Sequence, residues 1–114
     1  MNRRLLAIIV LLLPATAAAH AMLEHAEPSA GAQLNVSPKQ LHLDFSEPLE
    51  PAFSGLSITD SGGHSVANGA PVISGTTMTI SLKTIPSGSY RVQWHAVSVD
   101  THRTEGRYSF TVGP

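Results

Sequence analysis

A histidine at position 20 becomes a metal ligand if the chain is cut just before it. Ala17-Ala18-Ala19 precedes His20, and small side chains at Ala17 and Ala19 are what a signal peptidase requires at its cleavage site. Cleavage after Ala19 would leave His20 with a free α-amine and an imidazole, which together can chelate one metal ion. A terminal amine has an ordinary pKa of about 8, so a metal can displace its proton near neutral pH. The sequence therefore predicts an amine-and-imidazole chelate at His20.

The residues before position 17 have the layout of a secretory signal peptide. Two basic residues, Arg3 and Arg4, precede the apolar run 5–13, and Pro14 and a series of small residues follow that run. The apolar run is interrupted by Pro14 and is shorter than the roughly 20 residues that a transmembrane helix requires. A retained membrane anchor is therefore the weaker interpretation.

We expect residues 1–19 to be removed as a signal peptide and residues 20–114 to form the mature domain. Ala21 ends a second small-x-small pattern, and cleavage after it would start the chain at Met22. That cut would destroy the chelate. We favour the cut before His20, because the alanine-rich run is the better peptidase substrate.

A second pair of candidate ligands lies near the other end of the chain, at Asp100 and His102. Residues two apart in an extended chain project to the same side, so this carboxylate and this imidazole can face one point. Together with the amine and ring of His20, they would form a nitrogen and oxygen ligand set that suits tetragonal Cu(II), with zinc as a competitor. The Asp-x-His spacing alone is not specific, because such a pair on a loop is often solvated or stabilises a turn.

Composition limits the other classes of function. Removal of 19 of the 114 residues leaves 95, which is enough for one small domain. Without Arg3 and Arg4, the mature segment has 5 basic and 8 acidic residues and a formal charge of −3, which argues against nucleic acid or an anionic membrane surface as a partner. The chain has no cysteine, so a metal site must use nitrogen, oxygen or the thioethers of Met22 and Met78.

The elements that must position these ligands are β-strands. Apolar and polar residues alternate in the segment 40–46, where Leu41, Leu43 and Phe45 share one face. We expect strands in the segments 33–36, 40–46, 55–59, 78–82, 89–99 and 107–112, with weaker candidates at 65–66 and 72–73. Turn residues separate these segments. The sequence therefore predicts an all-β fold, an immunoglobulin-like antiparallel β-sandwich of about seven strands with Greek key connections.

Several short motifs follow one another along the chain in an order that points to a known family. The motifs are His20-Ala21-x-Leu23, Pro28 with Gly31, Leu43-x-Phe45-Ser46-Glu47, Phe53-Ser54-Gly55, Pro86-x-Gly88-x-Tyr90-x-Val92-x-Trp94, Ser98-Val99-Asp100-x-His102 and Gly106-x-Tyr108-x-Phe110-x-Val112. Together they cover essentially all of residues 20–114, and the chain resembles the CopC/YobA group of periplasmic copper-resistance proteins.

This resemblance implies a sandwich in the periplasm that binds one Cu(II) through a histidine brace. In such a brace His20 would bind by its amine and ring and His102 by its ring, with Asp100 completing the site. The family's glutamate after Phe-Ser matches Glu47, which we expect next to the metal as a weak ligand or a hydrogen-bond partner of the terminal amine. The resemblance also implies an inner-membrane copper transporter of the CopD type as partner, and we expect a soluble, monomeric mature form.

Some members of this family bind Cu(I) through a methionine-rich loop, but the corresponding segment 61–77 contains no methionine. A soft Cu(I) site is therefore not expected here. His64 is the only candidate ligand in that segment, and we expect it to be solvated.

The remaining candidate residues are expected to be structural or exposed to solvent. We expect Trp94 in the core, Met22 packed near a strand edge and His42 exposed on the polar face of its strand. His25 and His95 could approach the metal site, but we do not expect either to be a ligand. Arg103 and Glu105 are expected to be solvated, where they could help to recognise a partner.

Three functions from different classes follow from these observations. The first and favoured one is a non-enzymatic carrier that holds Cu(II) for resistance, storage or transfer. The second is a copper-dependent oxidative enzyme like the polysaccharide monooxygenases, which also use an N-terminal histidine brace. A carboxylate ligand at Asp100 and the short surface of a small domain argue against it. The third is an adhesive or accessory sandwich whose histidines are incidental.

Overall fold

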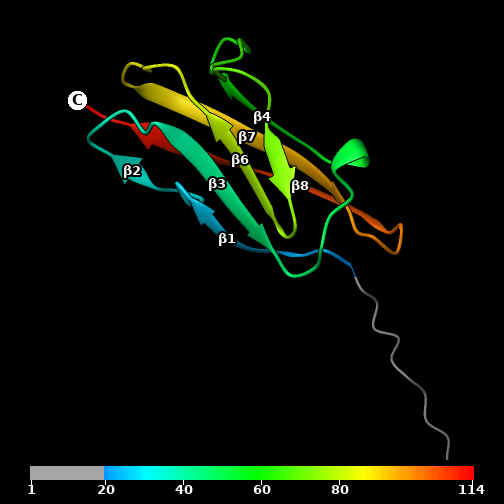
Figure 1. Ribbon diagram of the computed structural model, residues 1–114. Coiled ribbons are helices and arrows are strands. Elements are labelled where there is room, and N and C mark those ends of the chain that lie inside the picture. Colours follow the sequence, from blue (N-terminus) through cyan, green and yellow to red (C-terminus); the bar gives the residue numbers. More distant parts are fainter. Residues whose placement is uncertain (1–19) are drawn as a thin grey trace, which may run out of the picture.

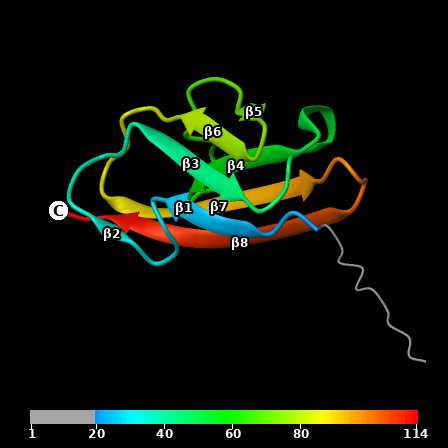
Figure 2. The same ribbon diagram turned by 60° about the horizontal axis from the view of Figure 1, so that its bottom comes forward.

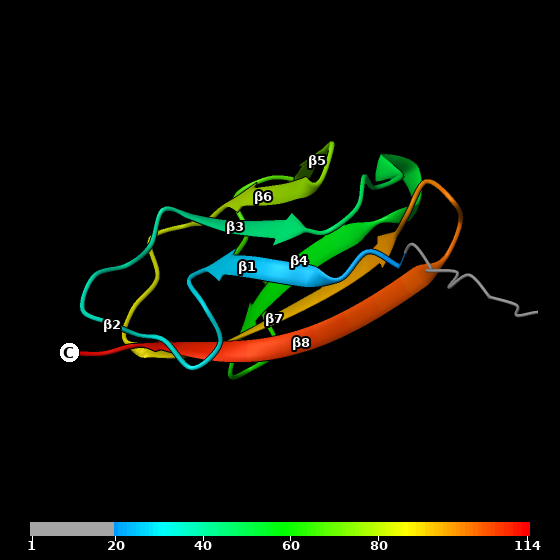
Figure 3. The ribbon, with the colours of Figure 1, turned by 90° about the horizontal axis from the view of Figure 1, so that it is seen from below.

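The computed structural model describes residues 20–114 as two stacked four-stranded sheets, which Figure 3 shows nearly edge-on. The strands are β1 (Leu23–Glu27), β2 (Gln33–Leu34), β3 (Gln40–Phe45), β4 (Gly55–Asp60), β5 (Val72–Ser74), β6 (Thr77–Ser81), β7 (Gly88–Val97) and β8 (Arg103–Val112), with a 3-10 turn η1 (Pro51–Phe53) before β4. One sheet has the order β1-β3-β6-β5 and the other the order β2-β8-β7-β4 (Figure 1). The predicted β-sandwich is therefore confirmed.

The alternation of apolar residues explains why these segments form strands around one core. Leu41, Leu43 and Phe45 of β3 are buried, whereas the residues between them are half-exposed. Strand β7 repeats this pattern with buried Tyr90 and Val92. Since successive side chains of a strand point to opposite faces, each sheet buries one face against the other and leaves one face to solvent.

The topology differs from the prediction in two details. Residues 20–114 form eight strands, and β2 pairs with β8 in parallel, whereas all other strand pairs in this segment are antiparallel. The additional strand is β1, which gave no alternating signal because Ala26 is its only buried residue and its register shifts between Leu23 and His25. Strand β8 begins at Arg103 rather than Arg107, because its polar first half is held by pairing with β7.

Trp94 packs into the sandwich as predicted. Its ring meets the ring of Phe45 edge to face, with the ring centroids 5.0 Å apart. The ring also covers Gly106 of the neighbouring strand, where an added Cβ would lie 2.6 Å from Trp94 Cζ2. A residue larger than glycine at position 106 would therefore force the indole out of its place, which explains the glycine in an otherwise regular strand.

The start of the described chain and the β7–β8 loop lie at the same end of the sandwich, as Figures 1 and 2 show. The loop that contains η1 lies at this end as well. The predicted signal peptide, residues 1–19, lies outside the described residues. Among residues 20–114 there is no helix with the length and apolar character needed to cross a bilayer.

Candidate metal centre

The loop between β7 and β8 is a tight turn that brings Asp100 and His102 together. The Ser98 amide donates to the His102 carbonyl at 2.9 Å, and the Thr101 amide donates to the Ser98 carbonyl at 2.7 Å. Thr101 has a φ of 75°, in the left-handed region that β-branched residues rarely adopt. The surrounding hydrogen bonds hold the loop in this conformation, so the positions of both candidate ligands are set by the turn itself.

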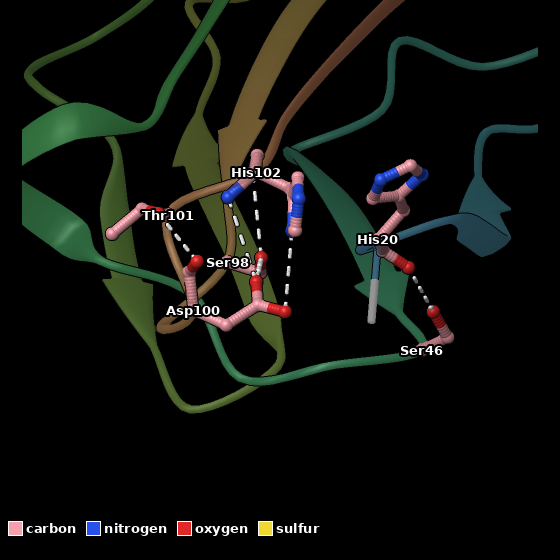
Figure 4. Close-up of polar contacts among 6 residues, drawn as sticks. All are labelled: His20, Ser46, Ser98, Asp100, Thr101 and His102. Atoms are coloured by element: carbon pink, nitrogen blue, oxygen red, sulfur yellow. Dashed lines mark hydrogen bonds and ion pairs between the residues drawn. The ribbon is translucent and has the colours of Figure 1, made fainter. Parts of the chain in front are cut away.

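Hydrogen bonds within this loop orient the Asp100 carboxylate (Figure 4). The buried Ser98 hydroxyl donates to Oδ1 of Asp100, and Oδ2 of Asp100 lies 3.2 Å from Nδ1 of His102. The Ser98 hydrogen bond, followed by the interactions with His102, lowers the pKa of Asp100 below its ordinary value despite partial desolvation. The carboxylate is therefore ionised and available as an oxygen ligand at neutral pH.

The other half of the candidate site is the first stretch of the described segment, which begins at His20. The Ser46 hydroxyl donates to the His20 carbonyl at 3.3 Å and accepts from the Met22 amide at 2.8 Å. The hydroxyl of Thr104 donates to the carbonyl of Ala21, a fully buried residue, at 2.7 Å. The two residues after His20 are thus fixed to both sheets by hydrogen bonds, although His20 itself is exposed.

These contacts bring His20 close to His102. The two imidazole rings have centroids 4.6 Å apart and meet edge to face. Figure 4 shows the His102 ring between the Asp100 carboxylate and His20. His102 and Asp100 are accessible from solvent, with 55% and 39% of their side chains exposed. The structure therefore gathers three of the four predicted ligand residues at one accessible place.

The side chains do not converge on one point in their present orientations. Within residues 20–114, no group of three or more His, Asp or Glu side chains is arranged to hold a metal ion. The Nδ1 atom of His102 faces Asp100, so this contact must open for both groups to bind one ion. The α-nitrogen of His20 is still part of a peptide bond in the full chain, so the fourth donor exists only after cleavage. The donor types nevertheless fit a borderline divalent cation.

Glu47 lies between the two halves of the candidate site. It follows Ser46, which bonds to His20, and precedes Pro48, whose carbonyl accepts from the Val99 amide at 3.2 Å. The residue is half-buried. Its carboxylate makes no hydrogen bond or ion pair with any other residue of the described segment, so the expected contact with the terminal amine remains a prediction.

The other histidines lie away from this loop. His25 is paired in register with Asp44 on β3, and the ring of His95 lies against Gly55 on the outer face of the other sheet. His64 is 82% exposed, as predicted, and pairs with Asp60. His42 was predicted to be exposed but is half-buried, because its Nε2 lies 2.9 Å from Asp44 Oδ1 and the two side chains cover each other.

Two further predictions concern residues around the candidate site. Met22 was expected to pack near a strand edge, but it is 58% exposed because the Met22 backbone pairs with Ser46 and leaves the side chain outside the core. Arg103 and Glu105 are exposed as predicted, and they form an ion pair at 3.1 Å.

Comparison with known proteins decides the family. The model of the CopC domain matches residues 23–113. The chain belongs to the CopC family.

Two relatives and one solved structure show the extent of the similarity within this family. Protein YobA of Escherichia coli K12 is 37% identical over 98 residues, which cover 82% of this chain and 79% of YobA. Copper transport protein CutJ of Bacillus subtilis is 32% identical over 113 residues, which cover 96% of this chain but only 21% of CutJ. The crystal structure of PcoC, a methionine-rich copper resistance protein from E. coli, superposes with a TM-score of 0.73 at 38% identity and covers 82% of this chain and 99% of PcoC.

Three residues that support the candidate site were not assigned a role from the sequence. Ser98, Ser46 and Thr104 contact the candidate ligands or their backbone through their hydroxyl groups. Ser98 carried a signal, because it is a serine on the apolar face of the predicted strand 89–99 and precedes an aspartate by two residues, the spacing of a local side-chain hydrogen bond. Ser46 and Thr104 gave none, since their partners lie 26 and 83 residues away in the sequence.

Proposed function

We propose that the chain is exported, loses residues 1–19 and then binds one Cu(II) in the periplasm through a histidine brace. His20 contributes its amine and ring, His102 its ring and Asp100 its carboxylate. The observation that carries this proposal is the 4.6 Å approach of the His20 and His102 rings beside the Asp100 carboxylate. Copper is the ion of choice, because relatives in this family are named as copper transport and copper resistance proteins.

The chemistry of the donors favours Cu(II) over softer or harder ions. Three nitrogens and one carboxylate oxygen suit the tetragonal geometry of Cu(II), and affinity for such a set is highest for copper among the first-row divalent metals. Glu47 is proposed as a weak ligand or as an acceptor for the terminal amine, a role that its position between Ser46 and Pro48 would permit.

We propose that this site is specific for the oxidised ion. The solved relative PcoC is described as methionine-rich, whereas this chain has only 3 methionines. Met78 is fully buried in the core and cannot reach an ion at the surface. Met22 carries the one exposed thioether among residues 20–114, and a single soft ligand is too few to hold Cu(I) tightly.

The proposed role is carriage rather than catalysis. A region similar to this chain makes up about a fifth of CutJ, a copper transport protein, which supports a partnership with a membrane copper transporter of the CopD type. The alternative of an oxidative enzyme would need a copper position open to oxygen. Asp100, held in place by Ser98, would occupy such a position.

A Cu(II) titration of the chain that begins at His20 tests this function. We expect one tight equivalent of Cu(II) with a tetragonal electron paramagnetic resonance (EPR) spectrum and loss of this site in the double variant His20→Ala, His102→Ala. The variant His64→Ala is the control, because His64 is an exposed histidine outside the site. Retention of full affinity in the double variant would refute the brace, and turnover of an oligosaccharide with ascorbate would favour the enzyme.

A further inference from the structure

A second set of metal-ligating side chains lies on the outer face of the sheet β1-β3-β6-β5. His25 and Glu27 come from β1, and His42 and Asp44 come from β3. The two strands are antiparallel, with His25 opposite Asp44 and Glu27 opposite His42. Each imidazole therefore has a carboxylate directly across the strand pair.

All four side chains belong to the face that the sandwich does not bury. The residues that alternate with them, Ala26, Leu41, Leu43 and Phe45, are buried in the core. His25 and Glu27 are exposed, and the side chains of His42 and Asp44 are 34% and 35% exposed. An ion in solution can thus reach all four donors without any opening of the core.

The spacing places two imidazoles around one carboxylate. His42 already contacts Asp44, with Nε2 and Oδ1 2.9 Å apart. His25 faces Asp44 from the neighbouring strand, and Cβ atoms of directly opposed residues lie about 4.5–5.5 Å apart. Each of the two imidazoles is therefore within reach of an ion bound to Asp44 once the ring of the exposed His25 turns toward it.

We propose that His25, His42 and Asp44, with Glu27 as a further oxygen donor, bind a second divalent cation of the borderline class, such as Cu(II) or Zn(II). As at the proposed brace, these side chains do not converge on one point in the described segment, so they must rotate when the ion binds. This site contains no terminal amine. It is therefore weaker than the brace, and it is present before and after cleavage at position 20.

The test uses the mature chain with the substitutions His20→Ala and His102→Ala, so that the brace is absent whether or not the proposed function is correct. Cu(II) alone is titrated into this background and followed by calorimetry and by EPR. We expect one remaining equivalent of Cu(II) with nitrogen coordination. Further substitution of His25→Ala and His42→Ala should weaken this binding at least 10-fold, and Asp44→Asn should weaken it as well without removing a ring.

His64→Ala in the same background is the matched control, because His64 also has a carboxylate neighbour, Asp60, but lies in the loop after β4, outside the proposed site. Circular dichroism of each variant checks that the sandwich is intact. The proposal is overturned if the background binds no Cu(II), if the His25→Ala, His42→Ala variant binds as tightly as the background, or if His64→Ala weakens binding as much as that variant does.

Discussion

The two halves of the candidate copper site are held in different ways. In the β7–β8 loop, Ser98, Asp100 and His102 contact one another through their side chains within a single turn. At the start of the described segment, only the backbone is fixed, by Ser46 and Thr104, and the His20 side chain is exposed. The loop half is therefore built by folding alone, whereas the terminal half gains its amine only when the chain is cut.

The largest effect expected from this difference comes from blocking the amine. Acetylation of the α-amine in the chain that begins at His20 leaves every side chain in place but removes one donor and the chelate. We expect Cu(II) affinity to fall by more than about 100-fold, beyond the roughly 10- to 100-fold that loss of a supporting partner costs. Competition titration against a Cu(II) chelator measures the change. Equal affinities for the free and acetylated chains would show that the amine is not a ligand.

A smaller effect is expected in the loop half from Ser98→Ala, which removes the hydroxyl that orients Asp100. Cu(II) affinity should fall about 10- to 100-fold, because the carboxylate loses its supporting hydrogen bond. Ser57→Ala is the control, since Ser57 is an exposed serine on β4. An unchanged affinity in Ser98→Ala would mean that Asp100 does not need this support.

Ser98→Ala should also change how the stability of the metal-free protein depends on pH. The pKa of Asp100 is lower in the folded chain than its ordinary value. The interactions of this carboxylate therefore stabilise the fold when the pH is above the ordinary pKa, and this stabilisation is lost as the pH falls through the folded pKa. Without the Ser98 hydroxyl, the folded pKa of Asp100 should rise toward its ordinary value. NMR titration of the Asp100 carboxyl carbon follows it, and an identical titration curve in both proteins would contradict the assigned cause.

In the terminal half, Thr104→Val should act on the backbone rather than on a ligand. The substitution keeps the shape of the side chain but removes the donor to the carbonyl of Ala21, which is fully buried. An unpaired buried carbonyl costs about 1–3 kcal/mol, so thermal unfolding should occur at a lower temperature. Thr111→Val, at an exposed position of β8, should change little. Equal stability of the two variants would show that this contact does not anchor the terminus.

The smallest effect is expected from Thr101→Gly in the loop. Glycine adopts a φ of 75° without strain, but it also has a larger conformational entropy in the unfolded chain. Relief of backbone strain and the larger entropy of the unfolded chain act in opposite directions, so the free energy of unfolding should change by less than about 1 kcal/mol. Denaturant unfolding measures it. A strong loss of Cu(II) affinity in a stably folded Thr101→Gly would show that the loop needs threonine for more than its conformation.

The sequence was sufficient for the core strands and for the meeting of two candidate ligands in one loop. The alternation of Leu41, Leu43 and Phe45 with polar residues indicates a strand, because successive side chains of a strand point to opposite faces. The Asp100-x-His102 spacing predicted that these two side chains face one point, and they do meet, at 3.2 Å, but the contact is made by a tight turn at Thr101 and not by the extended chain that the prediction assumed. In both cases the signal lies within a few consecutive residues.

Features that depend on distant residues could not be predicted. Strand β1 has little apolar alternation, and its strand structure depends on pairing with β3. The contacts of Ser46 and Thr104 with the first residues of the domain cross 26 and 83 positions. The left-handed turn at Thr101 has no sequence signal, because threonine is an unusual choice for it.

The measurement that tests the central claim most directly is pulsed EPR of Cu(II) bound to the exported protein, after intact-mass analysis of its N-terminus. We predict a chain that begins at His20 and one tetragonal Cu(II) coordinated by two imidazoles and the terminal amine. A chain that begins elsewhere, or a Cu(II) spectrum that is unchanged by acetylation of the amine, would contradict it.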